Sequence, residues 1–180
     1  MSDRFYWASL EQPQGIFYIM AHERGVCRIA WPQESFDAIV RFHQYHAPEA
    51  PLIADAQPLK ETIRQLEEYW NGQRTRFELP LYLLGTPFQI KVWTAVKTIA
   101  YGTVSTYSAI ASQIGNPQAM RAVGTATGRN PVPIIVPCHR VIGKNGTLTG
   151  FRGGLRLKAL MLSQEGYASF VEAGHNRFRY

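Results

Sequence analysis

Apolar residues near the start of the chain come in short runs separated by turn residues. Aromatic and β-branched side chains gather at Phe5 to Leu10, Ile16 to Met20 and Val26 to Trp31. Pro-Gln-Gly and Glu-Arg-Gly separate these runs, and such residues are typical of tight turns. The pattern predicts three antiparallel strands, and the run from Arg76 to Leu79 is a further candidate strand.

Between these runs the spacing of apolar residues becomes that of helices. Ser35 to Tyr45 and Pro58 to Trp70 each repeat apolar side chains at three or four positions, and Gly72 ends the second segment. We therefore predict a small antiparallel sheet with two helices in residues 1–80. The best candidate boundary to a second domain is Leu84-Gly85-Thr86-Pro87.

Residues beyond this boundary predict mainly helices. Thr86 and Pro87 suit the N-cap and first position of a helix that extends to Ile99. Ser105 is the expected cap of a second helix, which Gly115 closes.

A third helix is expected from residues 116–117 to about Gly128. Its spacing buries Met120 and Val123 and leaves Arg121 on the opposite side. Two helices joined by a short turn resemble a helix-turn-helix, whose second helix approaches DNA. A tight helical hairpin inside any enzyme has the same pattern, and Arg121 can equally be a solvated charge.

Charge is divided unevenly along the chain. The sequence carries 19 Lys and Arg against 13 Asp and Glu, a net charge of +6. Residues 1–80 hold 8 basic and 11 acidic residues, whereas residues 81–180 hold 11 and 2, so the two parts carry −3 and +9. A concentrated positive domain attracts polyanions, nucleic acid first among them. A surface that is basic only for solubility would spread this charge more evenly.

The chain contains two cysteines, Cys27 and Cys138, which allow neither a disulfide framework nor a paired zinc motif. His22 with Cys27, and His43 with His46, have loosely metal-like spacings, but two more ligands would have to come from elsewhere. No apolar run approaches the ~20 residues that cross a bilayer. We expect a cytoplasmic protein with reduced thiols, without a metal, cofactor or membrane segment.

Residues 130–143 contain the most reactive side chains of the chain. Three prolines restrict the backbone ahead of Cys138, His139 and Arg140. A thiol with a free pKa of about 8.5 is mostly protonated at neutral pH, so a nucleophilic cysteine needs a base or a positive charge beside it. His139 and Arg140 can supply both. The alternative is a Cys138 that is a small buried apolar residue, beside a core histidine.

The segment Pro137-Cys138-His139-Arg140-Val141 resembles the 6-O-alkylguanine-DNA alkyltransferases. The similarity covers residues 86–166, whereas residues 1–80 agree with the family only in the order of strands and helices. It also includes residues 88–93 (Phe-Gln-Ile-Lys-Val-Trp), 105–107 (Ser-Thr-Tyr), 129–133 (Arg-Asn-Pro-Val-Pro), 153–154 (Gly-Gly) and 165–166 (Glu-Gly).

The resemblance implies an α+β protein of two domains. Residues 1–80 would form a small antiparallel sheet with helices, of ribonuclease H-like type, and residues 86–180 a mainly helical, winged helix-turn-helix-like domain for DNA binding and alkyl transfer. The implied activity is that of a monomeric, single-turnover methylated-DNA-protein-cysteine S-methyltransferase. Its implied substrate is 6-O-alkylguanine, with 4-O-alkylthymine as a second candidate, flipped out of double-stranded DNA that is bound through the minor groove.

The resemblance also implies roles for individual residues. Cys138 would accept the alkyl group, His139 would draw its proton through a water, and Glu165 would orient the imidazole. Tyr107, whose alternative role is that of a core aromatic residue, would donate a proton to the leaving base. The implied substrate pocket is formed by Asn130, which braces the turn, with Thr127, Val141, Phe151 and Arg152. The implied DNA contacts are Arg121, as a finger entering the base stack, with Gly124, Thr125, Gly128 and Arg129.

Glu165 is notable on physical grounds as well. Leu157, Leu160 and Met161 have the spacing of the buried face of a helix, and Glu165 follows in its last turn. The helix dipole makes a negative charge there unfavourable by roughly 0.3 to 1 kcal/mol. Either a charged partner, such as protonated His139, or exposure to solvent would offset this cost.

Three positions depart from the family pattern. Ala100 stands where proline is usual, Phe151 where tyrosine is common, and Arg152 where serine is frequent. The last two changes remove a hydroxyl from the pocket rim and add a cation at the entrance. We therefore expect bulky and methyl adducts to be handled differently.

Other function classes remain open from the residues alone. An alkyltransferase-like lesion-binding protein would bind and flip the base without an acceptor cysteine, which Cys138 argues against. A helix-turn-helix regulator would bind one operator sequence and leave Cys138 inert. A cysteine hydrolase would turn over repeatedly and need an oxyanion site.

Overall fold

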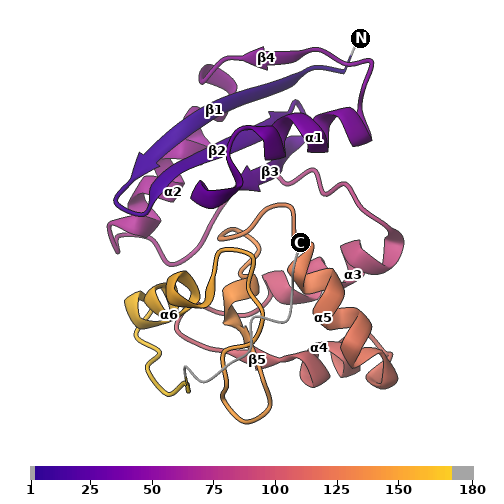
Figure 1. Cartoon of the computed structure of the whole chain (residues 1–180), viewed down its shortest axis with the longest axis vertical. Helices are drawn as coiled ribbons and strands as arrows, with labels where there is room; N and C mark the ends of the chain where they lie inside the picture. The colour runs from indigo at the N-terminus through magenta and orange to yellow at the C-terminus, as the bar shows by residue number, and fades with distance from the viewer. Residues whose placement is uncertain (1–2, 172–180) are drawn as a thin grey trace. The chain divides into compact units, whose positions relative to one another are not determined.

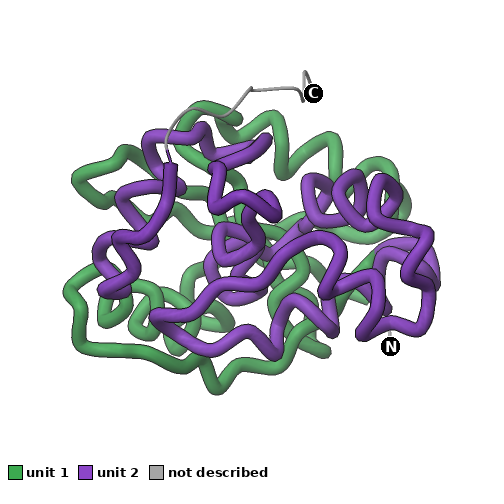
Figure 2. The backbone as a smooth tube through the Cα atoms, turned by 90° about the horizontal axis from the view of Figure 1, so that it is seen from below, with its two compact units in different colours: residues 1–84 green, residues 85–180 purple. Residues whose placement is uncertain are grey.

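The computed structural model describes residues 3–171. The chain divides into two compact units, residues 1–84 and residues 85–180 (Figure 2).

A four-stranded sheet forms the centre of the first unit. Strands β1 (Phe5–Gln12), β2 (Gly15–His22) and β3 (Gly25–Ala30) pair antiparallel, as the alternation of apolar runs and turns predicts. A short strand, β4 (Leu52–Ala54), adds to the edge of the sheet parallel to β1, giving the order β3-β2-β1-β4. Strand β4 could not be predicted from the sequence, because three residues are too few to show a period.

Helices cover both faces of this sheet (Figure 1). Helix α1 (Asp37–His46) places Ile39 in a cluster with Phe5, Met20 and Cys27. Helix α2 (Lys60–Trp70) ends with Trp70, whose ring lies 5.6 Å from that of Phe17. Because both faces are covered, every residue of β3 is buried. Two 3-10 turns, η1 (Pro32–Glu34) and η2 (Gln57–Leu59), precede the helices.

The strand predicted at Arg76 to Leu79 is wrong, because this segment is irregular. The side-chain amide of Gln65 takes the place of a neighbouring strand there. Its Oε1 accepts from the Glu78 backbone N–H at 2.9 Å, and its Nε2 donates to the Glu78 carbonyl at 3.3 Å.

Three helices and a 3-10 turn, η3 (Pro117–Ala119), begin the second unit. Helix α3 (Pro87–Lys97) starts as predicted, with a capping box between Thr86 and Gln89. Helix α4 (Tyr107–Gln113) is capped by Thr106, whose hydroxyl accepts from the Ala109 backbone N–H, and not by Ser105; both residues form the short strand β5 (Ser105–Thr106). Helix α5 (Met120–Gly128) follows η3.

Helices α3, α4 and α5 pack on one another. The indole Nε1 of Trp93 donates to the Ala126 carbonyl at 2.8 Å and ties α3 to α5. Val123 is fully buried as predicted, whereas Met120 is 50% exposed, so the prediction that it lies in the core is wrong. The 3-10 turn ahead of α5 breaks the helical spacing on which that prediction depended.

The rest of the second unit carries the Cys138 segment. Residues Cys138–Arg140 form a 3-10 turn, η4, and lead into strand β6 (Val141–Ile142), which pairs parallel with β5. Helix α6 (Leu155–Gln164) follows. Met161 is buried as predicted, but Leu160 is 42% exposed, because Lys158 occupies the buried face of the helix instead. Within residues 3–171, the helices are too short or too polar to span a bilayer.

Candidate active site

A rigid turn holds Cys138. The Asn130 side chain donates to the Val136 carbonyl at 2.8 Å and accepts from the Val132 backbone N–H at 3.0 Å, so it closes the turn from inside. Ile134 adopts a φ of +74° within this turn, a region costing a β-branched residue roughly 1 to 2 kcal/mol. The surrounding contacts must hold this conformation, and they fix the backbone ahead of Cys138.

His139 and Glu165 form a buried pair. The His139 Nε2 lies 2.7 Å from Glu165 Oε1, and neither side chain is exposed to solvent. A carboxylate only accepts, so Nε2 carries a proton and Nδ1 of a neutral ring has the lone pair. Nδ1 is buried and has no hydrogen-bond partner among the described residues. Of the two explanations for Glu165, exposure to solvent is therefore wrong, because its side chain is buried.

Arg140 completes the environment of Glu165. Its Nε donates to Oε2 at 2.8 Å and its Nη2 to Oε1 at 3.0 Å, while Nη1 donates to the Ile99 carbonyl at 2.6 Å. The Gly102 N–H lies 3.3 Å from Oε2. Gly102 has a φ of +73°, and a Cβ there would lie 2.9 Å from the Glu165 carbonyl, so only glycine permits this approach.

These contacts set the charges of the pair. Burial opposes the ionised form of Glu165, but hydrogen bonds from His139 and Arg140 outweigh it and lower the pKa to about 2. Burial lowers the pKa of His139 below 6.5, and Glu165 opposes this effect only in part. The resting pair is therefore a neutral imidazole on an ionised carboxylate, not the ion pair that the sequence suggested.

The Cys138 thiol is buried, and burial raises its pKa above that of a free cysteine. A hydrogen bond from Asn130 and the charges of Lys158 and Arg152 act in the opposite direction. The positive charge near the sulfur thus comes from these two residues, whereas Arg140, which we expected to supply it, is bound to Glu165.

Cys27 provides a contrast within the same chain. Its Sγ lies 3.4 Å from the Met20 carbonyl in the core of the first unit. Burial raises its pKa to about 12, and the opposing effects come from backbone hydrogen bonds and Arg28. Cys27 therefore fits the description of an inert core thiol, and Cys138 has neighbours that Cys27 lacks.

Lys158 lies near the site but was not predicted from the sequence to be a site residue. Its side chain is fully buried, and Nζ donates to the carbonyls of Val141 at 2.6 Å and Thr149 at 3.1 Å. Burial lowers its pKa to about 8, and the charge of Cys138 opposes this shift. One signal was available, because Lys158 lies seven positions before Glu165 and so falls on the same face of the terminal helix.

Tyr107 begins α4 and is only partly buried, so it is not a core aromatic residue. The Thr149 hydroxyl donates to its phenolic oxygen at 3.1 Å. Gly124 of α5 lies beside the ring, since a Cβ on it would lie 3.7 Å from Tyr107 Cδ1. Sequence reasoning did not identify Thr149 as a site residue.

The other expected pocket residues differ in exposure. Val141 and Phe151 are buried, and the Phe151 ring centroid lies 5.6 Å from Lys158 Nζ. Thr127 is also buried, at the end of α5, while Arg152 is partly exposed.

The expected DNA-contact residues belong to α5 and the position that follows it. Arg121, Thr125 and Arg129 are exposed and four residues apart, so they share one side of the helix. Gly124 and Gly128 are partly exposed between them. This side of α5 therefore lacks side chains at the two glycines and carries an arginine at each end.

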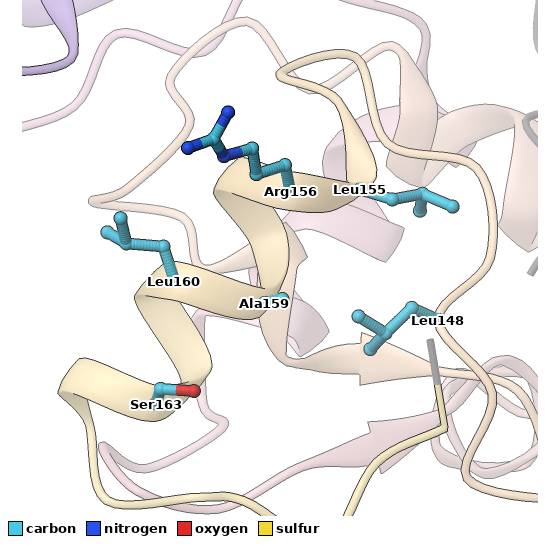
Figure 3. A pocket seen from close by; sticks show the side chains of 6 residues that line it. All are labelled: Leu148, Leu155, Arg156, Ala159, Leu160 and Ser163. Atoms are coloured by element: carbon cyan, nitrogen blue, oxygen red, sulfur yellow. The ribbon is translucent and has the colours of Figure 1, made fainter. Parts of the chain in front are cut away.

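A separate pocket of about 600 Å³ lies along α6 (Figure 3). Leu155, Arg156, Ala159, Leu160 and Ser163 line it from the helix, and Leu148 lines it from the preceding loop. None of these six is an expected site residue.

The described residues hold no cluster of three or more His, Cys, Asp or Glu side chains placed to bind a metal ion. His22, considered as a metal ligand with Cys27, lies 3.3 Å from Asp3 Oδ1.

Two family profiles match almost the whole chain. Residues 5–83 match the ribonuclease-like domain of 6-O-methylguanine DNA methyltransferase, and residues 87–167 match its DNA binding domain. These matches and the observed elements confirm the predicted fold class. The inducible methylated-DNA–protein-cysteine methyltransferase of Bacillus subtilis is 40% identical over 91% of this chain and 92% of its own length. The constitutive enzyme of the same organism is 43% identical over 89% and 94%.

Solved structures agree with these matches. The crystal structure of Mycobacterium tuberculosis O6-methylguanine methyltransferase has a TM-score of 0.77 and 38% identity, over 94% of this chain and 96% of that one. The structure of Mycobacterium tuberculosis OGT in complex with DNA has a TM-score of 0.75 and 35% identity, over 91% and 96%. With this similarity in sequence and structure, the chain belongs to the 6-O-methylguanine DNA methyltransferase family.

Proposed function

We propose that this protein repairs DNA by moving an alkyl group, typically methyl, from the 6-oxygen of guanine to Sγ of Cys138, once per molecule. The pairing of His139 with Glu165 is the observation that supports this assignment of the acceptor most directly. It leaves the basic nitrogen of His139, the residue adjacent to the thiol, without a hydrogen-bond partner within residues 3–171. A lesion-binding relative without a nucleophile would have no use for this arrangement.

His139 is needed as a base because the Cys138 thiol is protonated before the reaction. A thiol with a raised pKa supplies little thiolate at neutral pH. His139 Nδ1 would take the Cys138 proton through a water, and Glu165 would stabilise the imidazolium by accepting from Nε2. Lys158 and Arg152 would favour the thiolate electrostatically.

The transfer is a displacement at carbon. Sulfur forms a bond to the alkyl carbon, the bond from carbon to the guanine oxygen breaks, and its electron pair stays with the purine. Tyr107 would donate its phenolic proton to a purine nitrogen, so guanine leaves neutral. The imidazolium proton returns to the tyrosinate through solvent, so the net change moves the thiol hydrogen to guanine. The product thioether has no good leaving group, which makes the reaction a single turnover.

The exposed side of α5 is the proposed contact with double-stranded DNA. The target atom lies inside the duplex, so the nucleotide must be flipped out. Arg121 would fill the space that it leaves, and Gly124 and Gly128 would allow α5 to lie close to the walls of the minor groove. Thr125 and Arg129 would contact the backbone. Asn130, Thr127, Val141, Phe151 and Arg152 would surround the flipped base.

We further propose a division of labour between the domains expected from sequence, with DNA binding and alkyl transfer in residues 86–180. A monomer that acts in the reducing cytoplasm suits a reaction that consumes a free thiol.

Burst stoichiometry tests this proposal. The protein is mixed with a large excess of duplex carrying one 6-O-methylguanine, and the guanine formed is quantified from the oligonucleotide. We expect at most one guanine per protein chain, and none with Cys138→Ala, which should still bind the duplex. Continued turnover would instead indicate a hydrolase, and binding without any conversion would indicate a lesion-binding protein or regulator.

A further inference from the structure

Thr149 lies in the loop between β6 and α6 and contacts the proposed proton donor. Its hydroxyl donates to the Tyr107 oxygen at 3.1 Å, although 42 residues separate the two in sequence. A phenol has one hydrogen to give and lone pairs that accept. Because Thr149 occupies a lone pair, the Tyr107 hydrogen is left to point elsewhere.

Two anchors hold Thr149 in place. Its backbone carbonyl accepts from the buried Lys158 ammonium, which also binds the Val141 carbonyl, three residues after Cys138. The preceding residue, Leu148, is fully buried and clusters with Ile142 and Leu162. Figure 3 shows the Leu148 side chain directed toward α6, where Ala159 lies. The loop is thus fixed to the strand after Cys138 and to the terminal helix.

This geometry matters most when Tyr107 loses its proton. Negative charge then develops on the phenolic oxygen, and a hydrogen bond to a charged oxygen is roughly twice as strong as a neutral one. A donor already aimed at this oxygen needs no reorganisation during the reaction. The contact would therefore stabilise the transition state more than the resting protein.

We propose that Thr149 is a positioning residue for alkyl transfer, which directs the Tyr107 hydrogen toward the purine and stabilises the oxygen as the proton leaves. The inference rests on the proposed function and deepens it. No new covalent step is involved, because the Thr149 hydrogen stays on its own oxygen throughout.

The test compares Thr149→Val with Thr149→Ser in single-turnover reactions at saturating methylated duplex. Valine keeps the shape and removes the donor, whereas serine keeps the hydroxyl. We expect valine to lower the transfer rate constant by about tenfold, the usual order for one hydrogen bond to a charged group. DNA affinity should stay unchanged, and serine should restore most of the rate. A wild-type rate for Thr149→Val in active protein would overturn the inference.

A double variant separates this role from a general loosening of the loop. In a Tyr107→Phe background there is no phenolic oxygen, so adding Thr149→Val should cause no further loss. A further tenfold loss there would show that Thr149 acts without Tyr107 and would contradict the proposal.

Alkylation of the thiol by iodoacetamide provides a second readout, measured in a Cys27→Ala background so that only Cys138 reacts. Iodide leaves without a proton, so Thr149→Val should not change this rate. An equal loss in both reactions would mean that the substitution damages the thiol environment. If the wild-type protein transfers no methyl group at all, the proposed function fails, whereas wild-type transfer with an unaffected valine variant overturns only the role of Thr149.

Discussion

Two side chains share one carboxylate at the centre of the site. Glu165 accepts from both His139 and Arg140, so it remains ionised although it is buried. Arg140 balances its charge, and this leaves the imidazole free to stay neutral until it takes a proton. The buried charges are paired and hydrogen-bonded, as a low-dielectric environment requires.

The lowered pKa of Glu165 predicts a loss of stability in acid. The pKa falls from 4.5 to about 2 on folding, so the stabilisation is complete above pH 4.5 and is lost as the pH falls toward 2. The full effect is about 3 kcal/mol, of which about 2 kcal/mol is lost between pH 6 and pH 3.

Urea unfolding at the two pH values measures this loss. The comparison protein is the double variant Arg140→Met with Glu165→Gln, which removes both buried charges and leaves neither unpaired. Wild type should lose about 2 kcal/mol more than this variant between pH 6 and pH 3. Equal losses would contradict the assigned ionisation.

The lowered pKa of His139 predicts how the transfer rate constant changes as the pH is lowered. Because burial holds this pKa below 6.5, more than half of the imidazole is neutral at pH 6.5. The single-turnover rate constant should therefore remain near its neutral-pH value at pH 6.5 and decline only in more acidic buffer. A decline centred at or above pH 6.5 would mean that the imidazole titrates as an exposed histidine does.

At the scale of elements, α5 presents arginines and glycines on one side. If Arg121 fills the space of the flipped nucleotide, Arg121→Ala should slow methyl transfer from duplex DNA by roughly tenfold to a hundredfold, since flipping costs a few kcal/mol. Transfer from a single-stranded oligonucleotide, which needs no unpairing, should change much less.

Lys97→Ala is the matched control for this experiment, because Lys97 is an exposed cation at the end of α3. It should affect neither substrate strongly. Equal slowing of both substrates by Arg121→Ala would argue for a general electrostatic contribution instead of a finger.

Elements with several turns or a clear period were predictable from sequence, and the exceptions have identifiable causes. The first three strands and α1, α2 and α3 lie where apolar spacing and caps placed them. Gln65 satisfied the backbone of Glu78, which removed one predicted strand. The cap of α4 is one residue later than predicted, because the hydroxyl that accepts from the Ala109 N–H is that of Thr106.

The site was predictable to the extent that its residues are reactive types within a recognisable motif. Cys138, His139 and Glu165 can be identified from the sequence motif alone. Thr149 and Lys158 cannot, because their importance depends on which carbonyl or hydroxyl they reach, and this follows from tertiary contacts between distant segments.

At the scale of the whole molecule, the division of charge follows the division of the fold. Residues 81–180 carry +9 and include the unit with the proposed DNA-contact side, whereas residues 1–80 carry −3. Positive charge that contacts phosphates releases counterions, so DNA binding should weaken steeply with salt.

The salt dependence of DNA binding by one variant tests whether Arg129 belongs to the DNA-contact surface. Arg129→Ala should reduce the slope of log affinity against log salt by about one if Arg129 contacts one phosphate. Arg64→Ala is the control, because Arg64 lies on α2 of the acidic part and is paired with Glu61. Equal slopes for wild type and Arg129→Ala would remove Arg129 from the interface.

The account depends on Cys138 as the acceptor, and peptide mass spectrometry tests this directly. After reaction with excess methylated duplex, trypsin should release residues 130–140 with the mass of one added methyl group. Cys27→Ala should give the same result, because Cys27 is a core thiol whose pKa is about 12. A methyl group found on any other peptide, or an unmodified 130–140 peptide from protein that has restored guanine, would contradict the account.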